Sequence, residues 1–236
     1  MGFGENLVFL RKMRNQMSQE ELAEKIGVSR QTISKWEQNS CYPEMSKVIE
    51  LCKFFSCSMD ELIQKDMNVC DEAFSNIRVQ EIGAFRYMRY AVVSIEPEGD
   101  AINHVKGWAQ IFDIKNPQII GWDFPKVSQE LINVYHMHGY VAALILPDEV
   151  KQDIMPQDAE IINQRKQKYA AITVENPFRD AFHLIPNAYK TLLYHIQVNQ
   201  LSEGEPEGVI SCFEKSYDLD GVTYMDIYIA INSNIY

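Results

Sequence analysis

Ser18-Gln-Glu-Glu-Leu-Ala-Glu-Lys-Ile-Gly-Val-Ser-Arg-Gln-Thr-Ile-Ser-Lys-Trp-Glu37 is the stretch that decides the fold of the first part of this chain. Ser18 and Glu21 have the spacing of a capping box, which predicts that a helix begins here. Gly27 can adopt the left-handed backbone conformation that ends a helix, and Ser29 is placed to cap a second one. The stretch therefore predicts two short helices joined by a tight turn.

The second of these helices has separate packing and solvent faces. Ile33 and Trp36 share one face at helical spacing, which indicates packing against the first helix. The rest of its circumference carries Arg30, Gln31, Ser34 and Lys35. These side chains can donate to and accept from base edges and phosphates in a DNA groove. The pattern is typical of a helix that recognises DNA.

With this motif, residues 6–66 resemble the phage-repressor (Cro/repressor, or XRE) DNA-binding domain, a compact bundle of about five helices. The resemblance implies that Gln19 contacts a phosphate, that Arg30 suits guanine and that Gln31 suits adenine. Thr32 and Lys35 are expected to touch the DNA backbone. The predicted DNA-binding residues are Gln19, Ser29, Arg30, Gln31, Thr32, Ser34 and Lys35.

The remainder of residues 1–66 agrees with such a bundle. Val48, Leu51 and Phe55 form a helical stripe, and Ser58 is placed to cap a last short helix. Glu37 matches the family's acidic residue that pairs with a basic residue of the first helix. Two partners for it stay open at this point, Arg11 and Lys12. A small helical bundle without DNA-binding function is the alternative.

Charge is distributed unequally along the 236 residues. Residues 1–66 carry nine Lys/Arg and ten Asp/Glu, a net charge of −1. Residues 67–236 carry 13 Lys/Arg and 23 Asp/Glu, a net charge of −10. The acidic second part would repel a phosphate backbone, so DNA contact is expected in the first part. The acidity also fits a preference for cationic or neutral ligands, or simply a well-solvated surface.

Composition argues against several other classes of protein. No stretch reaches the roughly 18–20 apolar residues of a membrane span, so we expect a cytoplasmic protein without membrane contact. The five cysteines form no Cys-x-x-Cys pair, which indicates reduced thiols rather than a disulfide framework or zinc site. His136 and His138 alternate along the chain without a third ligand at related spacing. We expect no metal and no cofactor.

A second domain is predicted over residues 80–236, after a linker at 67–79. Its predicted elements are strands at 85–95, 119–124, 140–146 and 168–174, helices at 101–112 and 181–198, and a hairpin of 209–217 with 223–231. The second helix is expected to be interrupted near Pro186. The order strand–helix–strand–strand occurs twice. The chain as a whole is therefore predicted to be α+β, with an all-α domain followed by an antiparallel-sheet domain.

This duplicated order, together with residues 209–217 and 224–231, resembles the GyrI-like effector-binding domain. Ala230 stands where that family commonly has proline. The resemblance implies two halves related by an approximate two-fold axis, with a groove between them for small, often aromatic or cationic molecules. It also implies that Glu214 faces the ligand. Members of the family include sensors attached to DNA-binding domains, a gyrase-binding protein and hydrolases of electrophilic toxins.

Strand alternation adds further candidates for the ligand site. Tyr224, Asp226 and Tyr228 share one face of the last strand, where aromatic rings and a carboxylate suit a cationic aromatic molecule. The predicted ligand-binding residues are Glu214, Asp226, Tyr228, Tyr224, Trp122, Tyr140, Tyr169, Phe178 and Phe182. The alternatives are that the aromatic residues form core, and that Glu214 is a solvated strand charge paired with Lys215 or part of a hairpin salt bridge.

These observations predict a ligand-responsive transcriptional regulator that is not an enzyme. Its expected partners are a double-stranded DNA operator, a small-molecule effector and a second copy of the chain in a homodimer. One alternative is a hydrolase in which Glu214 acts as general base on a bound electrophile. Another is a protein-binding module of the gyrase-binding type, tethered to DNA.

Overall fold

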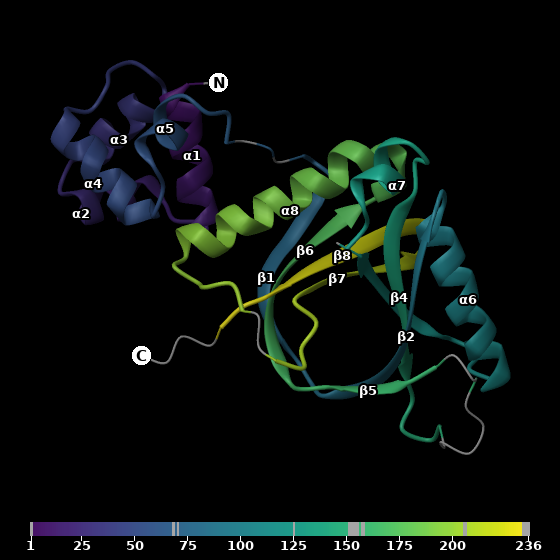
Figure 1. The fold of residues 1–236 in the computed structure, drawn as a ribbon. Coiled ribbons are helices and arrows are strands. Elements are labelled where there is room, and N and C mark those ends of the chain that lie inside the picture. Colours follow the sequence, from purple (N-terminus) through teal and green to yellow (C-terminus); the bar gives the residue numbers. More distant parts are fainter. Residues whose placement is uncertain are drawn as a thin grey trace.

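The computed structural model describes residues 2–67, Val69, 71–124, 126–150, Pro156, 159–204 and 207–232. A helical N-terminal domain is followed by a domain built on one curled antiparallel sheet (Figure 1). This confirms the predicted two-domain α+β architecture. No helix within the described ranges is long and apolar enough to cross a membrane.

The N-terminal domain contains the five expected helices, α1 (Phe3–Met13), α2 (Gln19–Ile26), α3 (Arg30–Glu37), α4 (Met45–Phe55) and α5 (Met59–Ile63). The predicted caps are all present. The Ser18 hydroxyl accepts from the Glu21 backbone, and Ser29 accepts from Thr32 at 3.1 Å. Gly27 ends α2 with φ of 68°. Local sequence signals therefore define the helix-turn-helix geometry.

An ion pair fixes α1 against the end of α3. Arg11 donates from Nε to Glu37 Oε1 at 2.6 Å and from Nη2 to Oε2 at 3.1 Å. Arg11 rather than Lys12 is thus the partner that the sequence left open. Leu7, Leu22 and Ile33 are fully buried in the core of the bundle.

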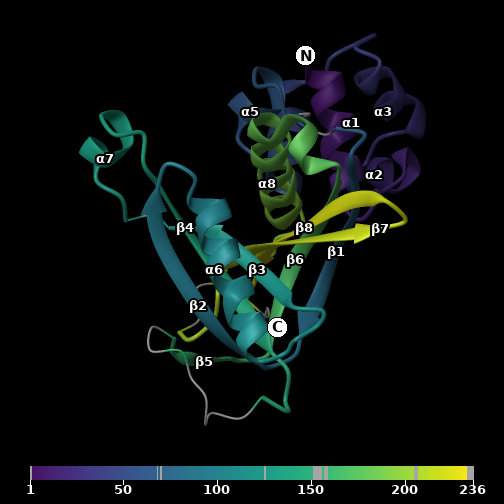
Figure 2. The same cartoon turned by 90° about the vertical axis from the view of Figure 1, so that its right-hand side faces the viewer.

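The second domain has one eight-stranded sheet in the order β1-β6-β8-β7-β3-β4-β2-β5, in which neighbouring strands are antiparallel. Its strands are β1 (Phe74–Ile82), β2 (Phe85–Ser94), β3 (Gln118–Asp123), β4 (His138–Leu146), β5 (Ile161–Gln164), β6 (Gln167–Glu175), β7 (Cys212–Leu219) and β8 (Val222–Ala230). Its helical segments are α6 (Pro97–Ile111), α7 (Gln129–Asn133), the 3₁₀ turn η1 (Pro177–Asp180) and α8 (Ala181–Val198). Figure 2 shows α6 and α8 lying against the sheet.

The sheet has two distinct faces. On the helix face, which α6 and α8 cover, Ile227 packs with Leu192 of α8, and Leu144 packs with Trp108 of α6. On the opposite face, Tyr169 and Phe213 belong to a third buried cluster. Alternate residues of each strand therefore enter different cores.

Several elements differ from the sequence-based expectation. Strand β1 begins at Phe74, inside the predicted linker, and pairs with β6 at the edge of the sheet. Its polar residues lie on both faces, with Arg78 and Gln80 half-buried and Glu81 exposed, so the segment lacks the apolar alternation of a central strand. Strand β5 and helix α7 are too short to give a periodic pattern.

The predicted interruption of the helix at Pro186 is wrong, because α8 runs without a break from Ala181 to Val198. Pro186 is the sixth residue of the helix, and the backbone bond it cannot make would have gone to the carbonyl of Phe182. Phe182 is 92% exposed, so water can satisfy that carbonyl.

Candidate functional site

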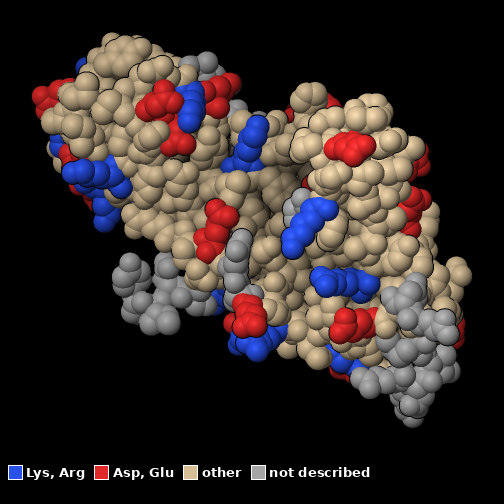
Figure 3. All heavy atoms as spheres, viewed as in Figure 1, with Lys and Arg blue, Asp and Glu red and all other residues tan. Residues whose placement is uncertain are grey.

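The surface of the helix-turn-helix gathers most of the residues predicted to bind DNA. Gln19, Arg30, Gln31, Ser34 and Lys35 line one shallow depression, and Arg30, Gln31 and Lys35 are exposed. In the view of Figure 3, Lys and Arg side chains gather at the outer edge of this domain, away from the sheet domain. The depression therefore presents donors and acceptors from two consecutive helices to solvent.

Three of the predicted residues also have structural roles. The Gln19 amide donates to Glu37 Oε2 at 2.7 Å, so Glu37 connects Gln19 to the Arg11 ion pair. The hydroxyls of Ser29 and Thr32 lie 2.9 Å apart at the first turn of α3. The Glu37 contacts link α1, α2 and α3, whereas the Ser29–Thr32 contact stabilises the start of α3 alone.

The register of the β7–β8 hairpin decides where Glu214 points. Asp220 and Gly221 form a two-residue turn with positive φ at both positions, so Leu219 pairs with Val222. From this turn the register places Glu214 opposite Ile227 and Asp226 opposite Lys215. Residues directly paired across antiparallel strands share a face. Glu214 is therefore on the helix face, and Asp226 is on the opposite face.

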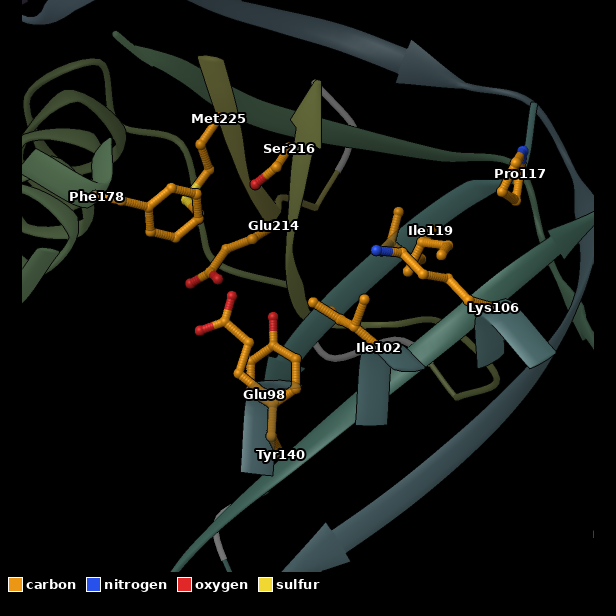
Figure 4. Close-up of a pocket in the computed structure, with 12 residues that line it drawn as sticks. Glu98, Ile102, Lys106, Pro117, Ile119, Tyr140, Phe178, Glu214, Ser216 and Met225 are labelled. Atoms are coloured by element: carbon orange, nitrogen blue, oxygen red, sulfur yellow. The ribbon is translucent and has the colours of Figure 1, made fainter. Parts of the chain in front are cut away.

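On the helix face, Glu214 borders a cavity of about 330 Å³ between α6, η1 and the central strands. The carboxylates of Glu98 and Glu214 and the hydroxyl of Tyr140 point toward the same part of it, and the Phe178 ring stands nearby (Figure 4). The complete lining is Glu98, Ile102, Lys106, Pro117, Ile119, Ile120, Gly121, Tyr140, Phe178, Glu214, Ser216 and Met225. Such a volume lies at the lower end of ordinary small-molecule sites.

Two tyrosines contact the Glu214 carboxylate. The Tyr189 hydroxyl, from α8, donates to Glu214 Oε1 at 3.0 Å. Tyr140, from β4, is buried and its hydroxyl also interacts with Glu214. The Tyr140 phenol lies directly over Gly121, where an added Cβ would be 2.1 Å from the Tyr140 oxygen. Only glycine at position 121 leaves room for this arrangement.

The electrostatics of the cavity disfavour a charged Glu214. Burial is the main cause that raises the pKa of Glu214 to about 7, and the negative charges of Asp123 and Glu98 raise it further. The hydrogen bonds from Tyr189 and Tyr140 act in the opposite direction. No ion pair among the described residues joins a Lys or Arg to Glu214. Lys106 also lines the cavity, and its ammonium stands apart from the two carboxylates in Figure 4.

Three of the nine predicted ligand residues, Glu214, Tyr140 and Phe178, line this cavity. Asp226, Tyr228 and Tyr224 do not share a site with Glu214, because the hairpin register puts them on the opposite face. There the Asp226 carboxylate accepts from Arg78 Nη2 at 2.8 Å and from Tyr228 at 3.0 Å. That network already pairs the Asp226 charge.

The remaining three predicted residues also lie elsewhere. Tyr169 is fully buried in the opposite-face core and donates to the Ile210 carbonyl at 2.9 Å. Trp122 packs against the same core. Phe182 projects into solvent from the first turn of α8. Tyr169 and Trp122 are thus aromatic core residues, the alternative that strand spacing had left open.

The sequence did not identify Glu98 and Tyr189 as residues of this site. Glu98, Ile102 and Lys106 recur every four residues on α6, a signal for one face of a helix. Periodicity does not show that this face borders a cavity instead of solvent. Within the described residues no group of three or more His, Cys, Asp or Glu is arranged to hold a metal ion.

Comparison with known proteins matches residues 10–62 to the Helix-turn-helix family. Over 63 residues the chain is 48% identical to the HTH-type transcriptional activator BcrR of Enterococcus faecalis. The matched segment covers 27% of this chain and 30% of that activator. The chain thus spans less than a third of the length of this relative.

Solved structures with similarity include a transcriptional regulator from Listeria innocua, 30% identical over 27% of this chain and 59% of that chain, with a TM-score of 0.26. The EcmrR–DNA complex covers 90% of this chain and 98% of that chain at 9% identity, with a TM-score of 0.47. The structure of SAV2435 bound to tetraphenylphosphonium matches 67% of this chain and 95% of that chain at 14% identity, with a TM-score of 0.40. Residues 10–62 of this chain, by their family match and their geometry, form a helix-turn-helix domain.

Proposed function

We propose that this chain is a DNA-binding transcriptional regulator whose sheet domain binds a small cationic, aromatic molecule at Glu214. The observation that carries the proposal is the half-buried Glu214 carboxylate, which borders a cavity without a paired basic group among the described residues. A cation placed beside it would interact strongly, because water screens charges poorly in such a site. The nearby carboxylate of Glu98 adds to this attraction.

The walls of the cavity suit a flat ligand. Phe178, Ile102 and Ile119 provide apolar surface against which a ring can pack, and Tyr140 adds an aromatic ring beside the carboxylates. An anionic ligand of the same shape would meet Glu98 and Glu214 with like charge. We therefore expect selection by charge sign as well as by shape.

Matched dyes provide the experiment that tests the ligand proposal. Rhodamine 6G carries a fixed positive charge on a flat ring system, and fluorescein is an anion on the same scaffold. Fluorescence anisotropy with the full chain at pH 8 is expected to show binding of rhodamine 6G at least tenfold tighter than fluorescein. Glu214→Gln should lose at least tenfold in rhodamine affinity, since the charge interaction disappears.

Glu160→Gln is the matched control, because Glu160 is exposed and outside the cavity lining. Equal affinity for both dyes, or undiminished rhodamine binding by Glu214→Gln, would contradict the proposal.

A hydrolase is the second candidate function, because a carboxylate with a pKa of about 7 beside tyrosine hydroxyls also suits a general base. Chromatography of a bound ester after incubation with the chain separates the two functions. A sensor returns the ester unchanged, whereas an enzyme gives the acid and alcohol at a rate that Glu214→Gln abolishes.

On the DNA side, we propose that Arg30 and Gln31 contact base edges, while Gln19, Ser29, Thr32 and Lys35 position the domain on the backbone and Ser34 faces the groove. The exposed donors of α3 support this assignment, as does the Glu37 network that holds Gln19 beside them. Domains of this type commonly bind paired half-sites, so we expect a homodimer on DNA.

Arg30→Ala is expected to relax base preference at one position of the selected DNA, with a loss of roughly 1–3 kcal/mol for the preferred base. Lys35→Ala should weaken binding to all sequences alike, because a phosphate contact carries no sequence information. Anisotropy titrations against the selected duplex and its single-base variants measure both effects. Identical specificity profiles for the two variants would show that the assigned roles are wrong.

A further inference from the structure

Helix α8 is the element of the sheet domain that connects the cavity with the helix-turn-helix domain. In Figure 1 it extends from above the sheet to the helical domain, and its last turn lies against α1. Val198, the last residue of α8, is fully buried within the core of the helical domain. Tyr194 packs edge-on against Phe9 of α1, with ring centroids 5.5 Å apart. One helix therefore belongs to both cores.

At the cavity, α8 is held by the ligand-facing carboxylate itself. Tyr189 donates to Glu214 at 3.0 Å, and η1, which directly precedes α8, contributes Phe178 to the cavity wall. A cation that pairs with Glu214 draws on the negative charge of the carboxylate that accepts from Tyr189, and so weakens that charge-assisted hydrogen bond. Occupancy of the cavity therefore acts on a contact that positions α8.

At the other end, polar contacts fix α8 to the helical domain. His195 Nδ1 lies 3.1 Å from the Met13 carbonyl, and the Asn199 amide donates to that carbonyl at 2.9 Å. Gln197 donates to the Ser56 carbonyl at 2.6 Å. Arg14 donates to the Val198 carbonyl at 2.8 Å, as a cation placed at the C-terminus of α8.

From α1 the contacts continue to the predicted DNA surface. Arg11, two residues before Met13 in α1, pairs with Glu37 at the end of α3, and Glu37 accepts from Gln19. A displacement of α1 relative to α3 would therefore disturb both helices that line the DNA-facing depression. The described contacts form a continuous path from Glu214 to Gln19.

We propose that α8 couples the two sites: ligand at Glu214 releases Tyr189, α8 shifts against α1 and α4, and the presentation of α3 to DNA changes. This inference rests on the proposed function, since it names how that cavity regulates DNA binding. A ligand alters DNA affinity only by the difference in its affinity for the two arrangements, typically 5- to 150-fold. Packed interfaces have discrete arrangements, so a small change at Glu214 can select between them.

Tyr189→Phe tests the inference without any ligand, because it removes the hydroxyl and keeps the ring. We expect faster backbone hydrogen exchange at the end of α1 and the last turn of α8, and at least a fivefold change in DNA affinity. Tyr135→Phe is the control, since Tyr135 is 53% exposed and outside both sites. Wild-type exchange and wild-type DNA affinity in Tyr189→Phe would overturn the inference.

A second variant, Asn199→Ala, acts at the other end of the helix. It should leave rhodamine 6G affinity within threefold of wild type and reduce the effect of the dye on DNA affinity. A dye that binds the wild-type chain through Glu214 but leaves its DNA affinity unchanged would overturn the coupling and preserve the ligand site. A dye that does not bind counts against the proposed function, and the ligand-free Tyr189→Phe comparison then decides the coupling alone.

Discussion

Glu214→Gln is expected to stabilise the protein at pH 8 by up to about 3 kcal/mol while it removes cation binding. The pKa of Glu214 is raised from 4.5 to about 7, mainly by burial. Between these values the folded state holds a proton that the unfolded state has lost, so stability falls as pH rises through this window. Gln carries no charge and can still accept from Tyr189, so the variant avoids this cost.

Urea denaturation at pH 8 and at pH 4.5 measures this effect. The difference between wild type and Glu214→Gln should be largest at pH 8 and nearly absent at pH 4.5, where Glu214 is protonated in the folded state. Glu160→Gln should match wild type at both values. A Glu214→Gln protein that is equally destabilised at both pH values would contradict the proposed strain on this carboxylate.

Gly121→Ala is expected to have the second large effect, because its Cβ would stand 2.1 Å from the Tyr140 oxygen and 2.6 Å from Cζ. The buried ring must leave its position, and overpacking of this kind costs about 1–3 kcal/mol. Rhodamine 6G affinity should fall as well, since Tyr140 forms part of the cavity wall. Denaturation and dye titration of the same variant measure both losses.

Gly107→Ala is the matched control, because an added Cβ at this position of α6 meets nothing within 4 Å. Alanine in a helix should leave stability unchanged or raise it by roughly 0.5–1 kcal/mol. The double variant Gly121→Ala/Tyr140→Leu should recover part of the lost stability by removing the clashing ring. Additive losses in the double variant would show that Tyr140 is not the residue displaced.

The helix-turn-helix could be predicted residue by residue because its signals are local. Ser18, Gly27 and Ser29 act on backbone groups within three or four residues, so their roles follow from spacing alone. The partner of Glu37 was different, because choosing between Arg11 and Lys12 required the rotation of α1 relative to α3. Tertiary packing supplies that rotation, and no local pattern records it.

The cavity was only partly predictable. The sequence contained enough to separate Glu214 from Asp226, since a two-residue turn at Asp220-Gly221 fixes the register of the whole hairpin. The sequence-based list of ligand residues nevertheless placed Asp226, Tyr224 and Tyr228 with Glu214, because it did not use this register. Tyr189 was beyond prediction, because only the packing of α8 against the sheet brings its hydroxyl to Glu214.

Strand β1 shows a second limit. Residues 74–82 are mostly polar and lie at the edge of the sheet, where half of the strand's backbone and side chains face solvent. Such a segment has nearly the composition of a linker. It becomes a strand because β6 provides a partner that lies about 90 residues further along the chain, and local periodicity contains no information about that pairing.

The most direct test of a charge-selective site at Glu214 is rhodamine 6G affinity between pH 6 and pH 8. The dye keeps its charge over this range, so a change in affinity reports ionisation of the protein. We predict that wild-type affinity rises about tenfold as Glu214, with its pKa of about 7, loses its proton, and that Glu214→Gln binds weakly at every pH. Wild-type affinity that does not change with pH, or a Glu214→Gln profile that rises like wild type, would contradict the account.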